Sequence, residues 1–195
     1  MNDTNKYYQD NARRFYSATV EIDMSAIYQH FLPLIQKGGS ILDAGCGSGR
    51  DSLNFKSQGY NAIAMDASSA LCELASGLLN QGVHCVGFEE ITWHKQFDGV
   101  WACASLLHAS KDQLPSILKR LANSLKAGGV MYASFKYGTT MRVKGGRAFT
   151  DMTEDTFAQL LQSVPVLSLK ESWVTADRRV DADKNRLNVI LTVSH

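Results

Sequence analysis

The fold of this chain is decided by one stretch, Ile41-Leu42-Asp43-Ala44-Gly45-Cys46-Gly47-Ser48-Gly49-Arg50. A short apolar run leads into alternating glycines, and a helical pattern follows. Glycine permits positive φ angles and lets a ligand approach the bare backbone. The first turn of a helix behind such a turn offers free N–H groups and a partial positive charge, which suit an anion. The stretch therefore predicts a strand, a ligand-binding turn and a helix in direct succession.

Short apolar runs alternate with helical patterns along the middle of the chain. Further runs of strand length cover residues 61–66, 83–86, 97–103 and 129–135. Their near-continuous apolar character is typical of strands buried on both faces. Helices are expected at about 50–58, 69–80 and 111–126, the last beginning with a capping box of Ser110 and Gln113 and ended by Gly128-Gly129. Strands that alternate with helices predict a parallel sheet with right-handed crossovers.

The two ends of the chain differ from the middle. Residues 1–36 carry two helical patterns, at about 7–18 and 23–36, which we expect to cap the sheet. Near the other end, a helix at about 153–162 precedes apolar runs that suit an antiparallel strand pair. The charged segment 176–186 would be the exposed tip of that pair.

Composition and charge exclude several classes of protein. The 195 residues are 45% hydrophobic and 20% charged, which suits a chain with a buried core and excludes a disordered or collagen-like one. No run approaches the ~18–20 apolar residues of a membrane helix, and the polar N-terminus does not resemble a secretory signal. Lys plus Arg total 20 and Asp plus Glu 19, without the basic excess of a dedicated duplex-DNA binder. The four cysteines form no CxxC pair, so we expect no metal site and a reducing cytoplasm.

An acidic residue ends the second strand. Asp66 follows the glycine turn at the distance where such an acid accepts hydrogen bonds from ribose hydroxyls. The dinucleotide fingerprint GxGxxG needs a third glycine at the position of Arg50. Asp43, beside the turn, would repel a pyrophosphate but suit an ammonium group. These features argue against a nicotinamide-dependent oxidoreductase.

The pattern acid-x-GxGxG resembles the first motif of the class I S-adenosylmethionine-dependent methyltransferases. The resemblance covers roughly residues 40–135, and the chain is most similar to the small tellurite-resistance-type and metabolite methyltransferases. It implies an α/β fold with a doubly wound, mostly parallel seven-stranded sheet and a C-terminal antiparallel strand pair. It also implies S-adenosyl-L-methionine as the cofactor. Residues 1–195 would form one domain, with a helical cap (1–36), a cofactor-binding half (37–135) and a substrate-side half (136–195).

The resemblance assigns cofactor contacts near the glycine turn. Asp43 would face the amino group of the cofactor, directly or through water. Asp66 would hold both ribose hydroxyls. The residues expected under the methionine part or beside the ribose are Gly45, Cys46, Gly47 and Ala67.

Further cofactor contacts are expected from other segments. After the third strand, Phe88 would pack on the adenine ring and Glu89 would accept from its amine, although an acid there could equally be solvated. The backbone of Cys103 would approach the cofactor at the end of the fourth strand. Tyr7 or Tyr16 would close over the cofactor and place a π-face near its sulfonium. The alternative is that this helix only packs, through Tyr8, Ala12, Phe15 and Tyr16.

The transfer of a methyl group from a sulfonium needs little machinery, because the leaving thioether is neutral. Placement of the nucleophile in line with the methyl group provides much of the rate acceleration. A base is needed only when the acceptor atom holds a proton. His108, just past the fourth strand, is the candidate base, the alternative being a histidine that only packs or caps a helix. Residues 136–147 hold basic residues and no acid. They would form either an anion-binding lid with Arg147 as the substrate contact, or a solvated loop.

These observations favour a cytoplasmic S-adenosylmethionine-dependent methyltransferase that acts on a small molecule. Three alternatives stay open: an RNA methyltransferase that uses the basic segment, a non-catalytic cofactor-binding module and a nicotinamide-dependent oxidoreductase. The net charge of +1 counts against a nucleic-acid partner. The identity of the acceptor atom and the oligomeric state are left open by the sequence.

Overall fold

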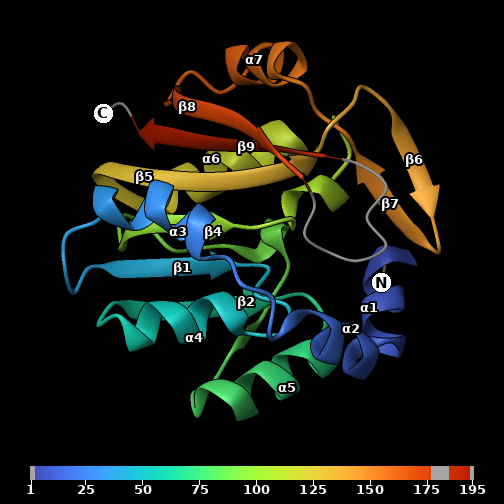
Figure 1. Ribbon diagram of the computed structural model, residues 1–195. Helices are drawn as coiled ribbons and strands as arrows, with labels where there is room; N and C mark the ends of the chain where they lie inside the picture. Colours follow the sequence, from blue (N-terminus) through green and yellow to red (C-terminus); the bar gives the residue numbers. More distant parts are fainter. Residues whose placement is uncertain (1–2, 177–184, 194–195) are drawn as a thin grey trace.

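A computed structural model describes residues 3–176 and 185–193 (Figure 1). Seven strands form one sheet in the order β3-β2-β1-β4-β5-β9-β8. Their bounds are β1 (Ser40–Ala44), β2 (Asn61–Asp66), β3 (His84–Cys85), β4 (Phe97–Ala102), β5 (Leu125–Lys136), β8 (Leu167–Thr175) and β9 (Arg186–Val193). The pairs from β3 to β5 are parallel, whereas β9 is antiparallel to both β5 and β8. The predicted mostly parallel seven-stranded sheet with its C-terminal antiparallel pair is confirmed.

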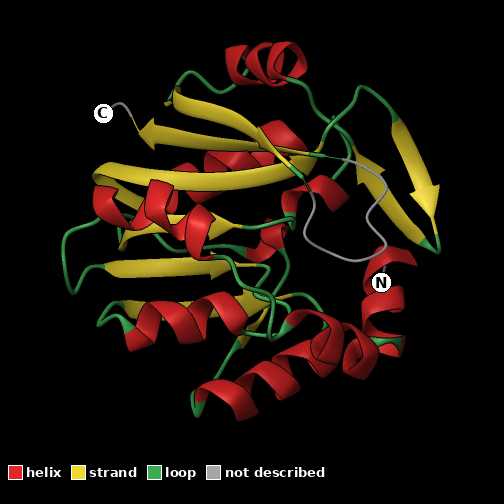
Figure 2. Cartoon of the chain, viewed as in Figure 1, coloured by secondary structure: helices red, strands yellow, loops and turns green. Residues whose placement is uncertain are grey.

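Helices cover both faces of the sheet, as the cartoon in Figure 2 shows. On one face lie α3 (Ser25–Phe31), α4 (Arg50–Ser57) and α5 (Ser69–Leu79), and on the other α6 (Leu114–Ser124) and α7 (Glu154–Gln162). Successive strand residues point to opposite faces, so Val100 packs with the α6 side and Trp101 with the α3 and α4 side. Both side chains are completely buried, because the sheet is covered on each face.

The helical segments differ from the sequence prediction at their ends. The pattern expected at 7–18 is two helices, α1 (Asp3–Asp10) and α2 (Ala12–Thr19), which meet at Asn11. The second pattern, expected at 23–36, forms α3 and a single 3₁₀ turn (Leu32–Leu34) that has Pro33 as its second residue. Proline lacks the N–H that a continuing α-helix needs.

The boundary between α6 and β5 also lies elsewhere than predicted. The reciprocal hydrogen bonds between Ser110 and Gln113 are present before α6. However, α6 ends at Ser124 and β5 begins at once, so that Gly128-Gly129 lie inside the strand. The pairing of β4 with β5 shifts its register there, between Phe97 and Gly99. The glycines therefore accommodate a bulge instead of ending a helix.

The basic segment expected as a loop forms a hairpin. Strands β6 (Met141–Lys144) and β7 (Arg147–Thr150) pair antiparallel and make a separate two-stranded sheet. Figure 1 shows this hairpin beside α1, at the C-terminal ends of the parallel strands. Most of the tip expected at 176–186 lies outside the described residues, which stop at Ala176 and resume at Asn185. The pairing of Thr175 with Arg186 confirms the strand pair that flanks it.

Candidate active site

A cavity of about 270 Å³ opens at the carboxyl ends of the parallel strands. It lies where β1 separates β2 from β4, the point at which the order of strands reverses. Ligands of open α/β sheets bind at such a switch point. The cavity is lined by the glycine turn after β1, the end of β2, the loops after β3 and β4, and parts of α1, α2 and β9.

The glycine turn is held from two sides and leaves no room for a side chain. Gly45 and Gly47 have φ angles of 85° and 55°, a region that disfavours other residues. A Cβ atom on Gly45 would lie 2.4 Å from the Cβ of Ser105, and one on Gly47 would lie 2.9 Å from the ring of Phe15. The backbone N–H groups of Gly45 and Cys46 both donate to the carbonyl of Met65, at 2.9 Å. The bare backbone of this turn therefore faces the cavity and fits a closely approaching cofactor.

Asp66 lines the cavity next to this turn, and Ala67 lines it as well. One carboxylate oxygen of Asp66 accepts from the N–H of Gly47 at 2.9 Å, and the other accepts from the N–H of Ser68 at 2.9 Å. Burial raises the pKa of this carboxyl group, and these backbone donors oppose the rise. The two strands thus place a fixed acceptor beside the turn. Its expected contact with ribose hydroxyls remains a prediction.

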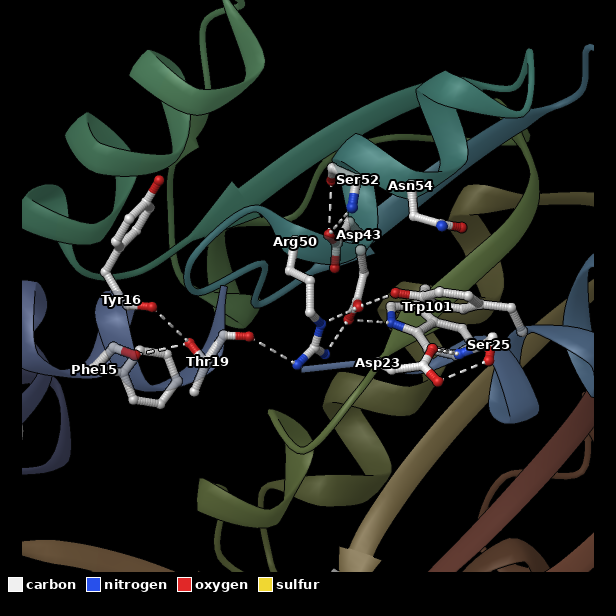
Figure 3. Close-up of polar contacts among 12 residues, drawn as sticks. Phe15, Tyr16, Thr19, Asp23, Ser25, Asp43, Arg50, Ser52, Asn54 and Trp101 are labelled. Atoms are coloured by element: carbon white, nitrogen blue, oxygen red, sulfur yellow. Dashed lines mark hydrogen bonds and ion pairs between the residues drawn. The ribbon is translucent and has the colours of Figure 1, made fainter. Parts of the chain in front are cut away.

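Asp43 points away from the cavity. Its carboxylate accepts from the backbone N–H of Ser52 at 3.1 Å and from the Ser52 hydroxyl at 2.7 Å (Figure 3). Burial, followed by the charge of Asp51, raises the pKa of Asp43 to about 8. Asp43 is absent from the described residues that line the cavity, so a direct contact with the amino group of a cofactor does not fit this orientation. A contact through water stays a prediction.

Arg50 and Asp51 line the cavity, and the sequence analysis assigned neither of them a role there. The Asp51 carboxylate accepts from Tyr28 at 2.5 Å, from the indole of Trp101 at 2.8 Å, and from Arg50 Nε and Nη2 at 2.7 and 2.9 Å. Arg50 Nη1 also donates to the carbonyl of Thr19 at 3.3 Å (Figure 3). In the sequence these two residues read as the ordinary exposed start of a helix.

The aromatic residues that reach the cavity from the N-terminal helices are Tyr8 and Phe15. Tyr7 and Tyr16, the residues predicted to close over the cofactor, are not among the described residues that line it. Closure of Tyr7 or Tyr16 over the cofactor stays a prediction. The Tyr7 ring instead packs under the guanidinium of Arg147, 4.4 Å from its centroid.

His108 lines the cavity with both ring nitrogens engaged. Nδ1 lies 2.6 Å from the carbonyl oxygen of Ala148, and Nε2 lies 2.8 Å from the hydroxyl of Tyr8. Since a carbonyl can only accept, Nδ1 carries the proton in the neutral ring, and Nε2 accepts from Tyr8. The lone pair of the expected base is therefore directed at Tyr8. A proton from an acceptor would reach His108 only by way of that hydroxyl.

The other predicted cofactor contacts lie on the cavity wall. Phe88 and Glu89 belong to a 3₁₀ turn (Phe88–Glu90), and Glu89 is exposed to solvent there. Cys103 follows β4 and lines the cavity beside them. Burial raises the pKa of its thiol to about 11, so Cys103 is a protonated wall residue and not a nucleophile. Burial also raises the pKa of Cys46, in the glycine turn, well above its ordinary value.

Arg147, the predicted substrate contact, packs on aromatic rings. Its guanidinium lies over the rings of Tyr7 and Phe149, at 4.4 and 5.4 Å from their centroids. It is not among the cavity-lining residues of the described chain. Arg147 therefore ties the β6–β7 hairpin to α1, and the prediction of a substrate contact does not fit its position.

In residues 3–176 and 185–193, no group of three or more His, Cys, Asp or Glu side chains is placed to hold a metal ion. Nor does any helix of that part have the length and apolar character needed to cross a membrane.

Comparison with known proteins finds a family that matches part of this chain. The methyltransferase-domain family matches residues 41–129, which run from β1 into β5. A curated relative, the cypemycin N-terminal methyltransferase of a Streptomyces species, is 29% identical over 116 residues, which are 57% of this chain and 47% of that protein. The chain spans 47% and 60% of the length of the first two curated relatives that it matches.

Solved structures show the same fold. The 1,6-didemethyltoxoflavin-N1-methyltransferase of Burkholderia thailandensis, solved with S-adenosylhomocysteine, has a TM-score of 0.76 at 22% identity and aligns over 97% of this chain and 85% of its own. A TehB-like S-adenosylmethionine-dependent methyltransferase of Corynebacterium glutamicum has a TM-score of 0.70 at 19% identity, over 97% and 98% of the two chains. Residues 41–129 therefore match a methyltransferase-domain family, and the chain has the fold of these S-adenosylmethionine-dependent methyltransferases.

Proposed function

We propose that this protein binds S-adenosylmethionine at the glycine turn and catalyses the transfer of its methyl group to a small-molecule acceptor. The observation that carries the proposal is the continuity of the cavity. It joins the bare turn and Asp66 to a polar wall of β5 and β9, beyond the loop that follows β4. One cavity can therefore hold a cofactor and an acceptor in contact, which is the main requirement for methyl transfer.

The cradle supplies a separate contact for each part of the cofactor. The backbone of Gly45 to Gly47 admits the methionine part at close range, and Asp66 accepts from the ribose. Phe88 and Glu89 border the place where adenine would lie. When bound, the cofactor supplies a methyl group on a sulfonium, and its departure leaves a neutral thioether.

Tyr8 and His108 would remove the proton from a methyl acceptor that carries one. The Tyr8 hydroxyl lies on the cavity wall and donates to His108 Nε2 at 2.8 Å. As the nucleophile gains the methyl group, its proton would pass to the Tyr8 oxygen while the Tyr8 proton passes to Nε2. The product would be an imidazolium, which Ala148 O stabilises through Nδ1–H.

Three of the four basic residues of 136–147 do not favour an RNA substrate, and Lys144 alone of the four is exposed to solvent. Lys136 is buried at the end of β5, Arg142 pairs with Asp151 at 3.1 Å, and Arg147 is stacked on aromatic rings. An RNA-binding surface needs such cations to face solvent, where they can meet phosphates. The B. thailandensis structure holds 1,6-didemethyltoxoflavin, which favours a small acceptor by analogy. A cytoplasmic location, expected from the four free cysteines, remains a prediction.

Calorimetry with S-adenosylhomocysteine and with NAD tests the proposal. We expect one S-adenosylhomocysteine site, no NAD binding, and about 10- to 100-fold weaker binding in Asp66→Asn, because the hydrogen bonds of a carboxylate are lost. The control is Asp112→Asn, an exposed acid outside the cavity, which should bind normally. Release of S-adenosylhomocysteine in a screen of small acceptors is the second readout. Preferential binding of NAD would refute the proposal, and cofactor binding without transfer to any acceptor would indicate a non-catalytic module.

A further inference from the structure

The cavity continues past the cofactor cradle to an end lined by two arginines. Arg50 reaches it from the first turn of α4, and Arg186 reaches it from the start of β9. Asp51 is the acidic residue at this end, among the described lining residues. The other lining acids, Asp66 and Glu89, lie with the glycine turn and the 3₁₀ turn after β3, which form the cofactor cradle.

Arg50 is held rigidly and keeps donors for a ligand. A guanidinium has five N–H donors, and three of them are used in the bonds to Asp51 and to the carbonyl of Thr19. One N–H on Nη1 and one on Nη2 are not used in these bonds within residues 3–176 and 185–193. Asp51 is itself satisfied by Tyr28 and Trp101, so its charge is committed to this cluster. The guanidinium is therefore preorganised at the cavity wall.

The charges of the two guanidinium groups both act on Cys103. Burial and the charge of Asp51 raise the pKa of Cys103, and the positive charges of Arg50 and Arg186 both lower it. Cys103 lines the same cavity as the two arginines. Both guanidinium groups therefore act electrostatically on one position of the cavity wall.

The neutral polar groups of this end are engaged with one another. The Tyr132 hydroxyl donates to the Asn188 side chain at 2.7 Å, and the Asn188 amide donates to Thr175 at 3.0 Å. The Ser134 hydroxyl accepts from the N–H of Ala104 at 2.9 Å. These residues form the cavity wall and are hydrogen-bonded within the protein. The arginines are therefore the groups expected to bind a charged ligand.

We propose that the methyl acceptor carries an anionic group, a carboxylate or a phosphate, that binds between Arg50 and Arg186. The inference rests on the proposed function and specifies its class of substrate. A planar guanidinium matches either anion through paired hydrogen bonds, and the enclosed position strengthens them. The arginine-lined end would then fix one end of the acceptor and direct the rest toward the cofactor.

The methionine carboxylate of the cofactor is a second anion that would fit the arginine-lined end. If it occupied the arginine-lined end, an anionic probe would bind only when that carboxylate is absent. The probes are therefore tested on protein saturated with S-adenosylhomocysteine and, separately, with 5′-methylthioadenosine, which lacks the amino-acid part.

Calorimetry with benzoate, phenyl phosphate and neutral benzamide provides the test. We expect the S-adenosylhomocysteine complex to bind benzoate or phenyl phosphate with a Kd at least about tenfold lower than that of benzamide. Arg186→Gln should abolish this preference and leave cofactor affinity within about twofold. Arg14→Gln, an exposed arginine on α2, is the matched control and should change nothing. Ala176→Glu adds a carboxylate at the same end without removing a contact, and should also abolish the preference.

Two results would overturn the inference. Anion binding confined to the 5′-methylthioadenosine complex would assign the arginine-lined end to the cofactor. Equal binding of benzoate and benzamide, unchanged in both cavity variants, would show that the charge of this end is not used. In either case the methyltransferase proposal would stand if S-adenosylhomocysteine still binds and a neutral acceptor is methylated. Failure to bind S-adenosylhomocysteine at all would instead refute the proposed function itself.

Discussion

The cradle and the cover of the cavity are held together by different kinds of contact. The cradle consists of the glycine turn and the residues around Asp66, which lie on adjacent parallel strands and bond through their backbones. The cover consists of α1 and the β6–β7 hairpin. It is held by side-chain bonds between distant parts of the chain. Tyr8 bonds to His108 and Thr4 to Ala148, and Asn5 and Gln9 of α1 bond to residues 67–70.

This difference indicates which part moves. The cradle is part of the continuous sheet, so opening it would break several strand pairs at once. The cover rests on a few partly exposed side-chain contacts, and elements of that kind open at low free-energy cost. We infer that the cofactor enters by release of the cover, while the cradle stays formed.

The largest effect is expected from filling the cradle. Gly45→Ala would place a Cβ 2.4 Å from the Cβ of Ser105 at a φ of 85°. Overpacking and the left-handed backbone together should lower the free energy of unfolding by about 2–5 kcal/mol and weaken S-adenosylhomocysteine binding at least about 100-fold. Chemical denaturation and calorimetry measure the two quantities.

A matched glycine separates the two causes. Gly59 has a φ of 86°, and a Cβ there would meet no atom within 4 Å. Gly59→Ala should therefore show only the backbone cost of about 1–2 kcal/mol, with normal cofactor binding. Equal losses in the two variants would mean that the close packing of the turn against Ser105 has no consequence.

The cradle was predictable from the sequence because its contacts are local. The spacing of Gly45, Gly47 and Asp66 fixes a turn between two strands, and all three residues line the cavity. Asp43 lies in the same motif, yet its orientation depends on Ser52 in the following helix. The direction of its side chain could therefore not be predicted from the motif alone.

The cover could not be predicted in the same way. Which face of a short helix turns inward depends on its tertiary partners, and α1 meets partners from η3 (Leu106–His108) and β7. The break at Asn11 further separates α1 from α2. For these reasons the sequence did not single out Tyr8 and Phe15 as the aromatic residues of α1 and α2 that line the cavity. The pairing of Arg147 with aromatic rings likewise depends on a hairpin that was expected as a loop.

The second prediction uses the buried acid of the cradle. The pKa of Asp43 is raised from 3.8 to about 8, so between these values the folded chain keeps a proton that the unfolded chain has lost. Its contribution to stability is present below about pH 4 and is lost as the pH rises toward 8. The free energy of unfolding should thus fall from pH 5 to pH 8, by up to about 1.4 kcal/mol per pH unit from this group.

Asp43→Asn should flatten that slope, as measured by urea unfolding at each pH. The control is Asp98→Asn, because the pKa of Asp98 is lowered and its proton is already lost above pH 5 in both states. A slope that persists in Asp43→Asn would show that another group binds the proton.

The third prediction tests the closure of the cover. Tyr8→Phe removes the hydroxyl that donates to His108 Nε2, and His108→Gln removes its partner. Each change should destabilise the protein by about 1 kcal/mol, and the double variant should cost less than the sum because both remove the same bond. If the pair also carries the acceptor proton, each variant should lower kcat about 100-fold for a protonated acceptor and leave KM unchanged. Additive effects on stability and an unchanged kcat would contradict the coupling.

The smallest effect is expected from Arg147, where structure and sequence prediction disagree most directly. Arg147→Gln removes a guanidinium stacked on Tyr7 and Phe149, at a partly exposed site where such contacts are worth about 0.5–1 kcal/mol. The loss should appear as faster hydrogen exchange in α1 and the hairpin, and KM for the acceptor should not change. Arg147→Lys should restore part of the protection, since a cation over the ring remains. A raised KM with unchanged hydrogen exchange would instead return Arg147 to the substrate role that its position in the sequence favoured.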